Sequence, residues 1–209
     1  TIVLFTADHG CHFKTRNDEY KRSCHDSSVR VPGAACGPGF NGGGRFEGLL
    51  SLLDFMPTLL DAAGVAIPEG VAGRSVMPAL RGGAEARSAA GREEAFIQMS
   101  EAQVGRAIRT KRWKYSVSAP GKDGYAEMAS GKYVEEFLYD VQADPYELTN
   151  LIGLESHREV ADRLKNRLVA MMKEAGEAEP EIISAKSRTD NIRREVFPDR
   201  DYPGRDWQS

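Results

Sequence analysis

The chain opens with a short apolar run, Thr1–Thr6, that stops abruptly at Asp8-His9-Gly10. A short continuous run rich in β-branched residues is typical of a central strand buried on both faces, as in parallel sheets covered by helices. Ligands of open α/β sheets bind outside the carboxyl ends of the strands. We therefore expect an α/β fold in which Asp8 and His9 lie at a functional strand end.

Asp8 and His9 are candidate ligands of one metal ion. Gly10 permits a tight turn, and such a turn would let the carboxylate and the imidazole reach the same cation. Carboxylate oxygens suit Ca²⁺ and Mg²⁺, whereas imidazole favours transition metals. The alternative is that both residues only cap the strand or form the turn.

The polar segment 11–28 supplies further candidates. Lys21 could bind an anionic group of a substrate as a point charge, or it could be a solvated surface lysine. His12 and His25 could act as acid–base groups, or they could be surface or satisfied core residues. Arg16 has the same two interpretations as Lys21. Arg30, at the start of the next extended piece, is interpreted as a structural ion-pair partner.

Residues 1–90 are expected to form one α/β domain. Residues 49–53 predict a short strand, and Asp54 is predicted to cap a helix from Phe55 to Ala63 that Gly64 ends. Pro57 fits the first turn of this helix, where its missing N–H costs little. The small, polar and charged segment from Gly82 to Gly91 marks a plausible domain boundary.

Residues 91–183 predict a smaller antiparallel α+β subdomain. Three strands are expected in it, at Ala95–Met99, Arg106–Val117 and Glu135–Val141. An amphipathic helix follows, with Ser156 and Glu159 as a capping box and Gly176 at its end. Its predicted apolar stripe is formed by Val160, Leu164, Leu168 and Met171. Residues 184–209 are interpreted as an irregular tail that wraps the domain.

Composition excludes some functions. The net charge of −3 gives no electrostatic case for nucleic-acid binding. No apolar run approaches the ~20 residues that span a bilayer, and the localisation stays open. Cys11, Cys24 and Cys36 are interpreted as buried thiols or as one local disulfide plus a free thiol, with metal ligation as the alternative.

Six segments carry recognisable motifs in a fixed order. They are the strand end Phe5–Gly10, the loop Lys21–Pro32, the helix Asp54–Gly64, the turn Gly73–Leu80, and the strand motifs Arg106–Tyr115 and Leu138–Leu151. Together they resemble the sulfatase family of the alkaline-phosphatase-like superfamily, over about residues 1–176. The resemblance implies part of an alkaline-phosphatase-like mixed sheet covered by helices, followed by the small C-terminal subdomain.

The resemblance also implies a mechanism. A formylglycine hydrate made from Cys or Ser attacks the sulfur of a sulfate ester, and a divalent cation holds both reactants. The cation is usually Ca²⁺, with Mg²⁺ or Mn²⁺ as alternatives. Carried over to this sequence, Asp8 and His9 are metal ligands and Lys21 binds the sulfate. His12, Arg16 and His25 become candidate contacts to a sulfated small molecule or carbohydrate.

The chain departs from the family pattern at the nucleophile. The cysteine form of the family's nucleophile motif is absent, because none of the three cysteines is followed by x-Pro-x-Arg. We therefore expect this chain to be the C-terminal half of a sulfatase. Its N-terminal half would lie upstream in the same gene or on a separate chain, and the chain alone would be inactive. Two other hypotheses remain: a phosphodiesterase or phosphonate hydrolase of the same superfamily, and a non-catalytic binding module with the sulfatase fold.

Overall fold

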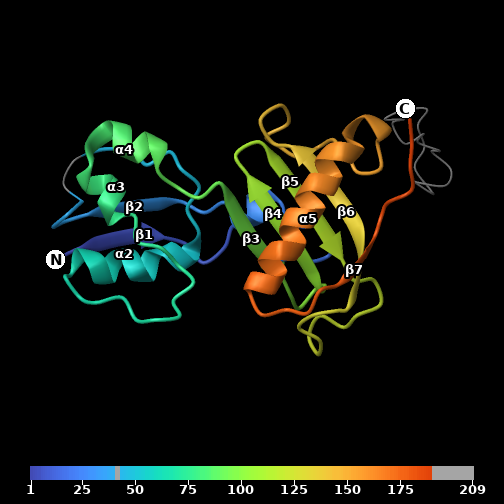
Figure 1. The fold of residues 1–209 in the computed structure, drawn as a ribbon, viewed down its shortest axis with the longest axis horizontal. Helices are drawn as coiled ribbons and strands as arrows, with labels where there is room; N and C mark the ends of the chain where they lie inside the picture. Colours follow the sequence, from blue (N-terminus) through green and yellow to red (C-terminus); the bar gives the residue numbers. More distant parts are fainter. Residues whose placement is uncertain (41–42, 190–209) are drawn as a thin grey trace, which may run out of the picture.

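The computed structural model describes residues 1–40 and 43–189. The described chain has two parts, which lie side by side in Figure 1. Residues 1–90 contribute a two-stranded ribbon and short helices, together with a loop that reaches across to the second part. The second part is a five-stranded sheet with one long helix on its surface. This is a mixed α/β arrangement, as expected.

The apolar run at the start of the chain forms β1 (Val3–Thr6), which pairs antiparallel with β2 (Gly33–Cys36). The predicted strand is confirmed, but its predicted burial is wrong for this structure. Val3 is 55% exposed and Phe5 is 65% exposed. Within the described residues β2 is the only strand paired with β1, so β1 lacks the second neighbouring strand that a central strand of a large sheet has.

The predicted strand over residues 49–53 is also wrong. Leu49 makes only an isolated bridge to Arg92, and residues 52–54 form a 3₁₀ turn. The Ser51 side chain accepts a hydrogen bond from the Leu53 N–H, and the Asp54 carboxylate accepts one from the Ser51 N–H. Short apolar runs occur in strands and in buried turns. Here the capping box between Ser51 and Asp54 stabilises the turn.

The predicted helix follows as α2 (Phe55–Ala62), and Gly64 with a φ of 71° ends it. Asp54 does not cap it with its side chain. The carboxylate instead accepts hydrogen bonds from the Arg74 N–H at 2.8 Å and from the Arg92 guanidinium. These bonds tie the start of α2 to two distant loops.

The segment predicted as a polar boundary contains helical structure. α3 (Met77–Arg81) and α4 (Gly83–Ala89) follow each other closely before the chain enters the sheet. Alanine has the highest helix propensity, and the alanines of residues 83–90 explain why this small-residue segment becomes a helix.

The sheet runs in the order β3-β4-β5-β6-β7, and all its pairs are antiparallel except β6 with β7. Its strands are β3 (Glu94–Met99), β4 (Gly105–Thr110), β5 (Trp113–Ser118), β6 (Lys132–Asp140) and β7 (Glu181–Ile183). The single strand predicted over residues 106–117 is therefore a hairpin. Lys111 and Arg112 make its turn, and neither residue type signals a turn in a sequence.

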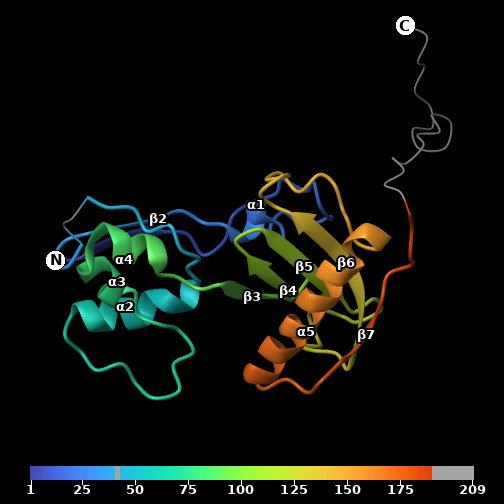
Figure 2. The same ribbon diagram turned by 45° about the horizontal axis from the view of Figure 1, so that its top comes forward.

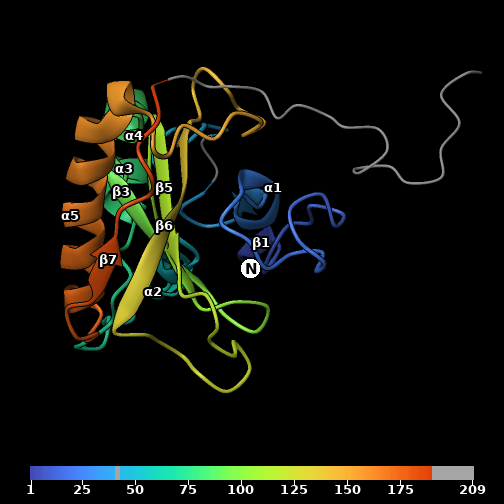
Figure 3. The same ribbon diagram turned by 90° about the vertical axis from the view of Figure 1, so that its right-hand side faces the viewer.

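The predicted amphipathic helix is α5 (Arg158–Glu174), which follows a 3₁₀ turn over Glu155–His157. The predicted capping box is wrong, because Ser156 lies inside that turn and its hydroxyl contacts the His157 ring. α5 covers one face of the sheet, and α1 (Asp26–Val29) with the preceding loop lies on the other face (Figure 3).

The main core lies between α5 and the sheet. The fully or nearly fully buried side chains of this layer come from α5, β4, β5 and β6, and they include Leu164, Leu168, Met172, Ile108, Tyr115, Val117 and Leu138. Every one of these positions except Met172 falls within a segment that the sequence predicts as a strand or as the helix stripe. Met172 takes the place of the predicted Met171, which is only partly buried.

Replacing Leu168 tests this layer. Leu168 is 0% exposed, so Leu168→Ala removes buried apolar contacts and leaves a cavity. We expect the free energy of unfolding in urea to fall by about 2–5 kcal/mol. Leu148 is 76% exposed, and Leu148→Ala should change it by less than about 0.5 kcal/mol. Equal effects of the two variants would contradict the assigned core.

The described part of the predicted tail runs along the sheet domain after β7 (Figure 2). Arg188 forms a parallel bridge with Leu154, and its guanidinium donates to the Asn150 carbonyl at 2.6 Å. Residues 190–209 of the tail lie outside the described residues. Within the described chain, no helix is long and apolar enough to cross a membrane. Cys11, Cys24 and Cys36 are free thiols, and burial raises the pKa of Cys24 to about 12.

Candidate metal and anion site

Asp8, His9 and Lys21 come together directly after β1. The Nε2 atom of His9 lies 3.5 Å from Asp8 Oδ2 and 2.9 Å from Lys21 Nζ. The Nδ1 atom of His9 lies 2.8 Å from the Gly10 carbonyl, which can only accept, so Nδ1 carries the ring hydrogen. Nε2 therefore has a free lone pair, and the Lys21 ammonium donates to it. The turn that the sequence predicts brings a carboxylate and an imidazole lone pair to one point.

This pair fits part of a cation site. The Asp8 side chain is 87% exposed, so its oxygens are free to bind a ligand. Ca²⁺ takes about 6–8 oxygen ligands, far more than this pair supplies. Among the described residues, no group of three or more His, Cys, Asp or Glu side chains could hold a metal ion. Asp8 and His9 thus offer two donors that need further ligands.

Tyr20 forms one wall of the site and was not identified from the sequence. Its ring lies edge-on to His9 with centroids 5.9 Å apart, and Lys21 Nζ lies 5.4 Å from its centroid. An aromatic face attracts a nearby ammonium, which helps to hold Lys21 next to His9. Its position next to Lys21 was the only signal for it in the sequence.

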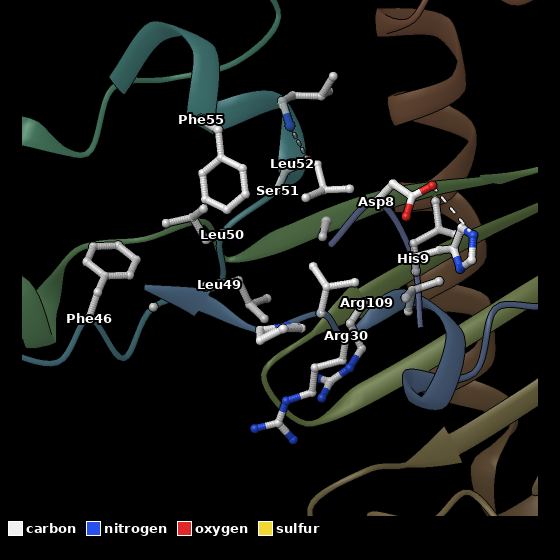
Figure 4. Close-up of a pocket in the computed structure, with 18 of the residues that line it drawn as sticks. Asp8, His9, Arg30, Phe46, Leu49, Leu50, Ser51, Leu52, Phe55 and Arg109 are labelled. Carbon is white, nitrogen blue, oxygen red and sulfur yellow. Dashed lines mark hydrogen bonds and ion pairs between the residues drawn. The ribbon is translucent and has the colours of Figure 1, made fainter. Parts of the chain in front are cut away.

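The site opens onto a groove between the two parts of the structure. Figure 4 shows Asp8 and His9 at one side of this groove, with apolar side chains such as Phe46 and Phe55 at the other. Arg30 also lines it, and its guanidinium has no ion-pair partner within the described chain, contrary to the role interpreted from the sequence. The groove is therefore lined by cationic side chains such as Lys21 and Arg30 and by apolar side chains such as Phe46 and Phe55.

Two of the other predicted contact residues, Arg16 and His25, pack against the sheet domain. Arg16 donates to the main-chain carbonyls of Tyr146 and Glu147, at 2.6 and 2.9 Å. His25 is buried with its ring nitrogens 3.2 Å from Ser23 Oγ and 3.2 Å from Tyr139 Oη.

Burial lowers the pKa of His25 to about 3, so its ring is neutral at ordinary pH. His12 is 2% exposed, and neither of its ring nitrogens has a hydrogen-bond partner within the described protein. The structure thus brings Asp8, His9 and Lys21 together but does not bring His12, Arg16 and His25 to them.

Gly10 fixes the turn that carries Asp8 and His9. Its N–H donates to the Ser28 carbonyl at 2.7 Å, so the turn is bound to α1. A Cβ at position 10 would lie 2.1 Å from the Ser27 carbonyl oxygen, which is closer than real contacts allow. Only glycine lets the two backbones approach this closely.

Gly10→Ala should displace the turn. We expect it to lower the free energy of unfolding by about 1–3 kcal/mol, because the backbone must shift to accept the new methyl group. The measurement is urea unfolding followed by circular dichroism. Gly131→Ala is the matched control, since a Cβ there meets nothing within 4 Å. A Gly10→Ala protein as stable as Gly131→Ala would contradict the close packing of the turn on α1.

Asp26, the first residue of α1, forms an ion pair with the sheet. Its two carboxylate oxygens each lie 3.2 Å from the Arg109 guanidinium on β4. Burial on its own would raise the pKa of Asp26. The hydrogen bonds from Arg109 and Lys114 outweigh that effect and hold the pKa below its ordinary value of 3.8.

The lowered pKa of Asp26 predicts a loss of stability in acid. A group whose pKa is lower in the folded state stabilises fully above its unfolded pKa, and this contribution disappears as the pH falls through the folded pKa. We expect the free energy of unfolding to fall as the pH drops below about 4. The fall should be less steep in Asp26→Asn. Equal slopes in the two proteins, measured by urea unfolding from pH 5 to pH 2.5, would contradict this role of Asp26.

Comparisons with known proteins identify the family. The sequence model of the family described as N-sulphoglucosamine sulphohydrolase, C-terminal, matches residues 18–174, which is well over half of the chain. Arylsulfatase K of Mus musculus is 34% identical over 163 residues, covering 72% of this chain and 27% of that protein. An arylsulfatase of Clostridium perfringens is 33% identical over 174 residues, covering 81% of this chain and 33% of that protein.

A solved structure agrees with these relatives. The structure of BT1596, a 2-O GAG sulfatase, superposes with a TM-score of 0.68 at 28% identity, and the match covers 84% of this chain and 37% of that one. The chain thus spans between a quarter and two fifths of the relatives that it matches. It belongs to the sulfatase family and corresponds to the C-terminal region of its members.

Proposed function

We propose that this chain supplies half of the active site of a metal-dependent sulfatase. Asp8 and His9 are two ligands of a divalent cation, with Ca²⁺ as the first candidate and Mg²⁺ or Mn²⁺ as alternatives. Lys21 binds the sulfate group. The observation that carries the proposal is the convergence of Asp8 Oδ2, His9 Nε2 and Lys21 Nζ at one strand end, in a chain of the sulfatase family.

The chemistry of these three side chains fits sulfate-ester hydrolysis. A bound divalent cation would supply positive charge that stabilises negative charge on the sulfate oxygens as the ester bond breaks. The Lys21 ammonium adds a second positive charge, which counts most where negative charge grows in the transition state. The Gly10 carbonyl holds the His9 ring in the tautomer that leaves Nε2 free for a cation.

Lys21 and a cation would compete for the same lone pair of His9. In the structure the ammonium occupies the position in front of Nε2, at 2.9 Å. A cation bound there would repel the ammonium, and an anionic sulfate nearby would attract it. Lys21 is therefore suited to leave His9 for a sulfate oxygen, and its flexible four-carbon stem allows this movement.

The remaining parts of the site are proposed to come from outside these 209 residues. None of the three cysteines is followed by x-Pro/Ala-x-Arg, and the serine that fits this pattern, Ser88 of residues 88–92, comes after the metal-ligand candidates rather than before them; the chain also spans only 27% of its relative arylsulfatase K. The nucleophile and the other metal ligands would then belong to a segment of the longer parent protein or to a partner chain.

The proposed substrate is a sulfated carbohydrate. The support is the likeness to a 2-O GAG sulfatase at 28% identity. His12, Arg16 and His25 stay predictions as substrate contacts. The proposal does not depend on them, because Arg16 and His25 are bonded to the sheet domain and His12 is buried. Lys21 lines the groove and is the proposed sulfate-binding group.

Assays of the longer parent protein test this function. We expect it to hydrolyse an aryl sulfate and to lose this activity when a chelator removes the cation. Adding Ca²⁺, Mg²⁺ or Mn²⁺ back singly would identify the metal. A bis-aryl phosphate diester should be hydrolysed at a much lower rate. Faster hydrolysis of the diester than of the sulfate would assign the site to phosphodiester chemistry, and full activity in the presence of chelator would contradict the metal ligands.

A further inference from the structure

Lys114 is a charged residue in the interior of the protein. It lies on β5 and is 0% exposed. Its strand neighbours Tyr115 and Val117 belong to the core under α5, so Lys114 extends from the opposite face of the sheet, where α1 lies (Figure 3). A buried ammonium without a partner is strongly unfavourable, so its contacts must compensate for its lost hydration.

Two carboxylates provide that compensation. Lys114 Nζ lies 2.6 Å from Asp26 Oδ1, and it forms a second ion pair with Glu147, whose side chain is 2% exposed. The other Glu147 oxygen accepts a hydrogen bond from the Asp26 N–H at 2.7 Å. Asp26 is therefore held both by its side chain and by its backbone N–H. Lys114 forms ion pairs with both carboxylates of this arrangement, Asp26 and Glu147.

α1 in turn holds both sides of the candidate site. The Ser28 carbonyl accepts the Gly10 N–H, which fixes the turn with Asp8 and His9. The Ser28 hydroxyl lies 3.2 Å from the Ser23 hydroxyl, and the Ser23 N–H donates to the Lys21 carbonyl at 2.9 Å. Because α1 has only four residues, a shift at Asp26 cannot be absorbed before Ser28.

We infer that Lys114 is a positioning residue for the Asp8–His9 turn, acting through Asp26 and α1. It touches none of the three site residues and lies 88 positions after Asp26 in the sequence. The inference that Lys114 positions the turn depends only on these contacts. Its effect on cation binding rests on the proposed function of Asp8 and His9.

Hydrogen–deuterium exchange of the 209-residue chain separates this role from a general loss of stability. In Lys114→Met the peptide covering residues 8–12 should exchange at least about tenfold faster, relative to the peptides of β4 and β5, than in the wild type. Leu168→Ala is the control, because it weakens the core on the other face of the sheet. It should speed exchange in the β4 and β5 peptides, whose core it weakens, and should not raise the exchange of residues 8–12 relative to them.

A second variant keeps the test decisive if Lys114→Met fails to fold. Glu147→Gln preserves the shape of the side chain and removes one of the two negative charges that neutralise Lys114. Glu147→Gln should also raise the exchange rate of residues 8–12 relative to the peptides of β4 and β5, by a smaller factor than Lys114→Met. An exchange ratio between residues 8–12 and the β4 and β5 peptides that is no higher than in the wild type, in both variants, would overturn the inference.

Titration with Mn²⁺ alone adds a readout at the site. Paramagnetic broadening of the His9 signals should require several-fold more Mn²⁺ in Lys114→Met than in the wild type. If the wild type shows no broadening of these signals, the proposed metal ligands fail, and the exchange ratio still decides whether Lys114 positions the turn. Equal Mn²⁺ dependence in the two proteins, with broadening present, would overturn the effect of Lys114 on the site.

Discussion

Asp8→Asn is expected to lower kcat/KM for a sulfate ester by at least about 10²-fold in the longer parent protein. The change keeps the size of the side chain and removes the negative charge proposed to bind the cation. The Asp8 side chain is 87% exposed and has no packing role, so the free energy of unfolding should stay nearly unchanged. Metal content per protein molecule, measured by elemental analysis, should fall together with activity.

Asp18→Asn is the matched control for this prediction. Asp18 lies in the same loop region, is exposed and touches none of the site residues. Its replacement removes the same charge from the surface and should leave the activity within about twofold of the wild type. If Asp8→Asn retained the activity and the metal content of the wild type, Asp8 would not be a ligand.

Lys21→Met is expected to have an effect of similar size, about 10²-fold in kcat/KM, with a different signature. Removing the ammonium removes the charge proposed to bind sulfate, so KM should rise and kcat should fall. Metal affinity without substrate should increase, because the ammonium 2.9 Å from His9 Nε2 no longer occupies that lone pair or repels a cation. Steady-state kinetics and a titration with the metal alone measure the two effects.

Lys14→Met provides the comparison for Lys21→Met. Lys14 is exposed in the same loop and carries the same charge, but it does not line the groove. It should change neither metal affinity nor kcat by more than about twofold. A loss of metal affinity in Lys21→Met would contradict the proposed competition between the ammonium and the cation for His9.

Local sequence signals predicted most of the secondary structure. The helical spacing of apolar residues predicted α5, and the run ending at Gly64 predicted α2. The β4–β5 hairpin was missed because Lys111-Arg112 carries no turn signal. The burial of β1 was overestimated, since burial depends on which elements cover a strand and an apolar sequence does not specify them.

The candidate site could be predicted only where its residues are close in the sequence. Asp8 and His9 are adjacent and follow an apolar strand, so the turn that joins them has a local signal. The contact between Lys114 of the sheet domain and Asp26 of α1 has no such local signal. The two residues are 88 positions apart, and only the folded order of the strands brings them together. A lysine in the middle of a strand is normally exposed, so its burial could not be expected from the sequence.

Turnover of an aryl sulfate by the pure 209-residue chain tests the central claim most directly. The site proposed for this chain has two metal ligands and one sulfate-binding lysine, and the proposed nucleophile lies outside these 209 residues. With Ca²⁺ present and millimolar substrate, the chain alone should release no sulfate above the buffer rate, whereas the longer parent protein should. Release proportional to the concentration of the chain, and lost in Lys21→Met, would show that these residues form a complete active site and would contradict the account.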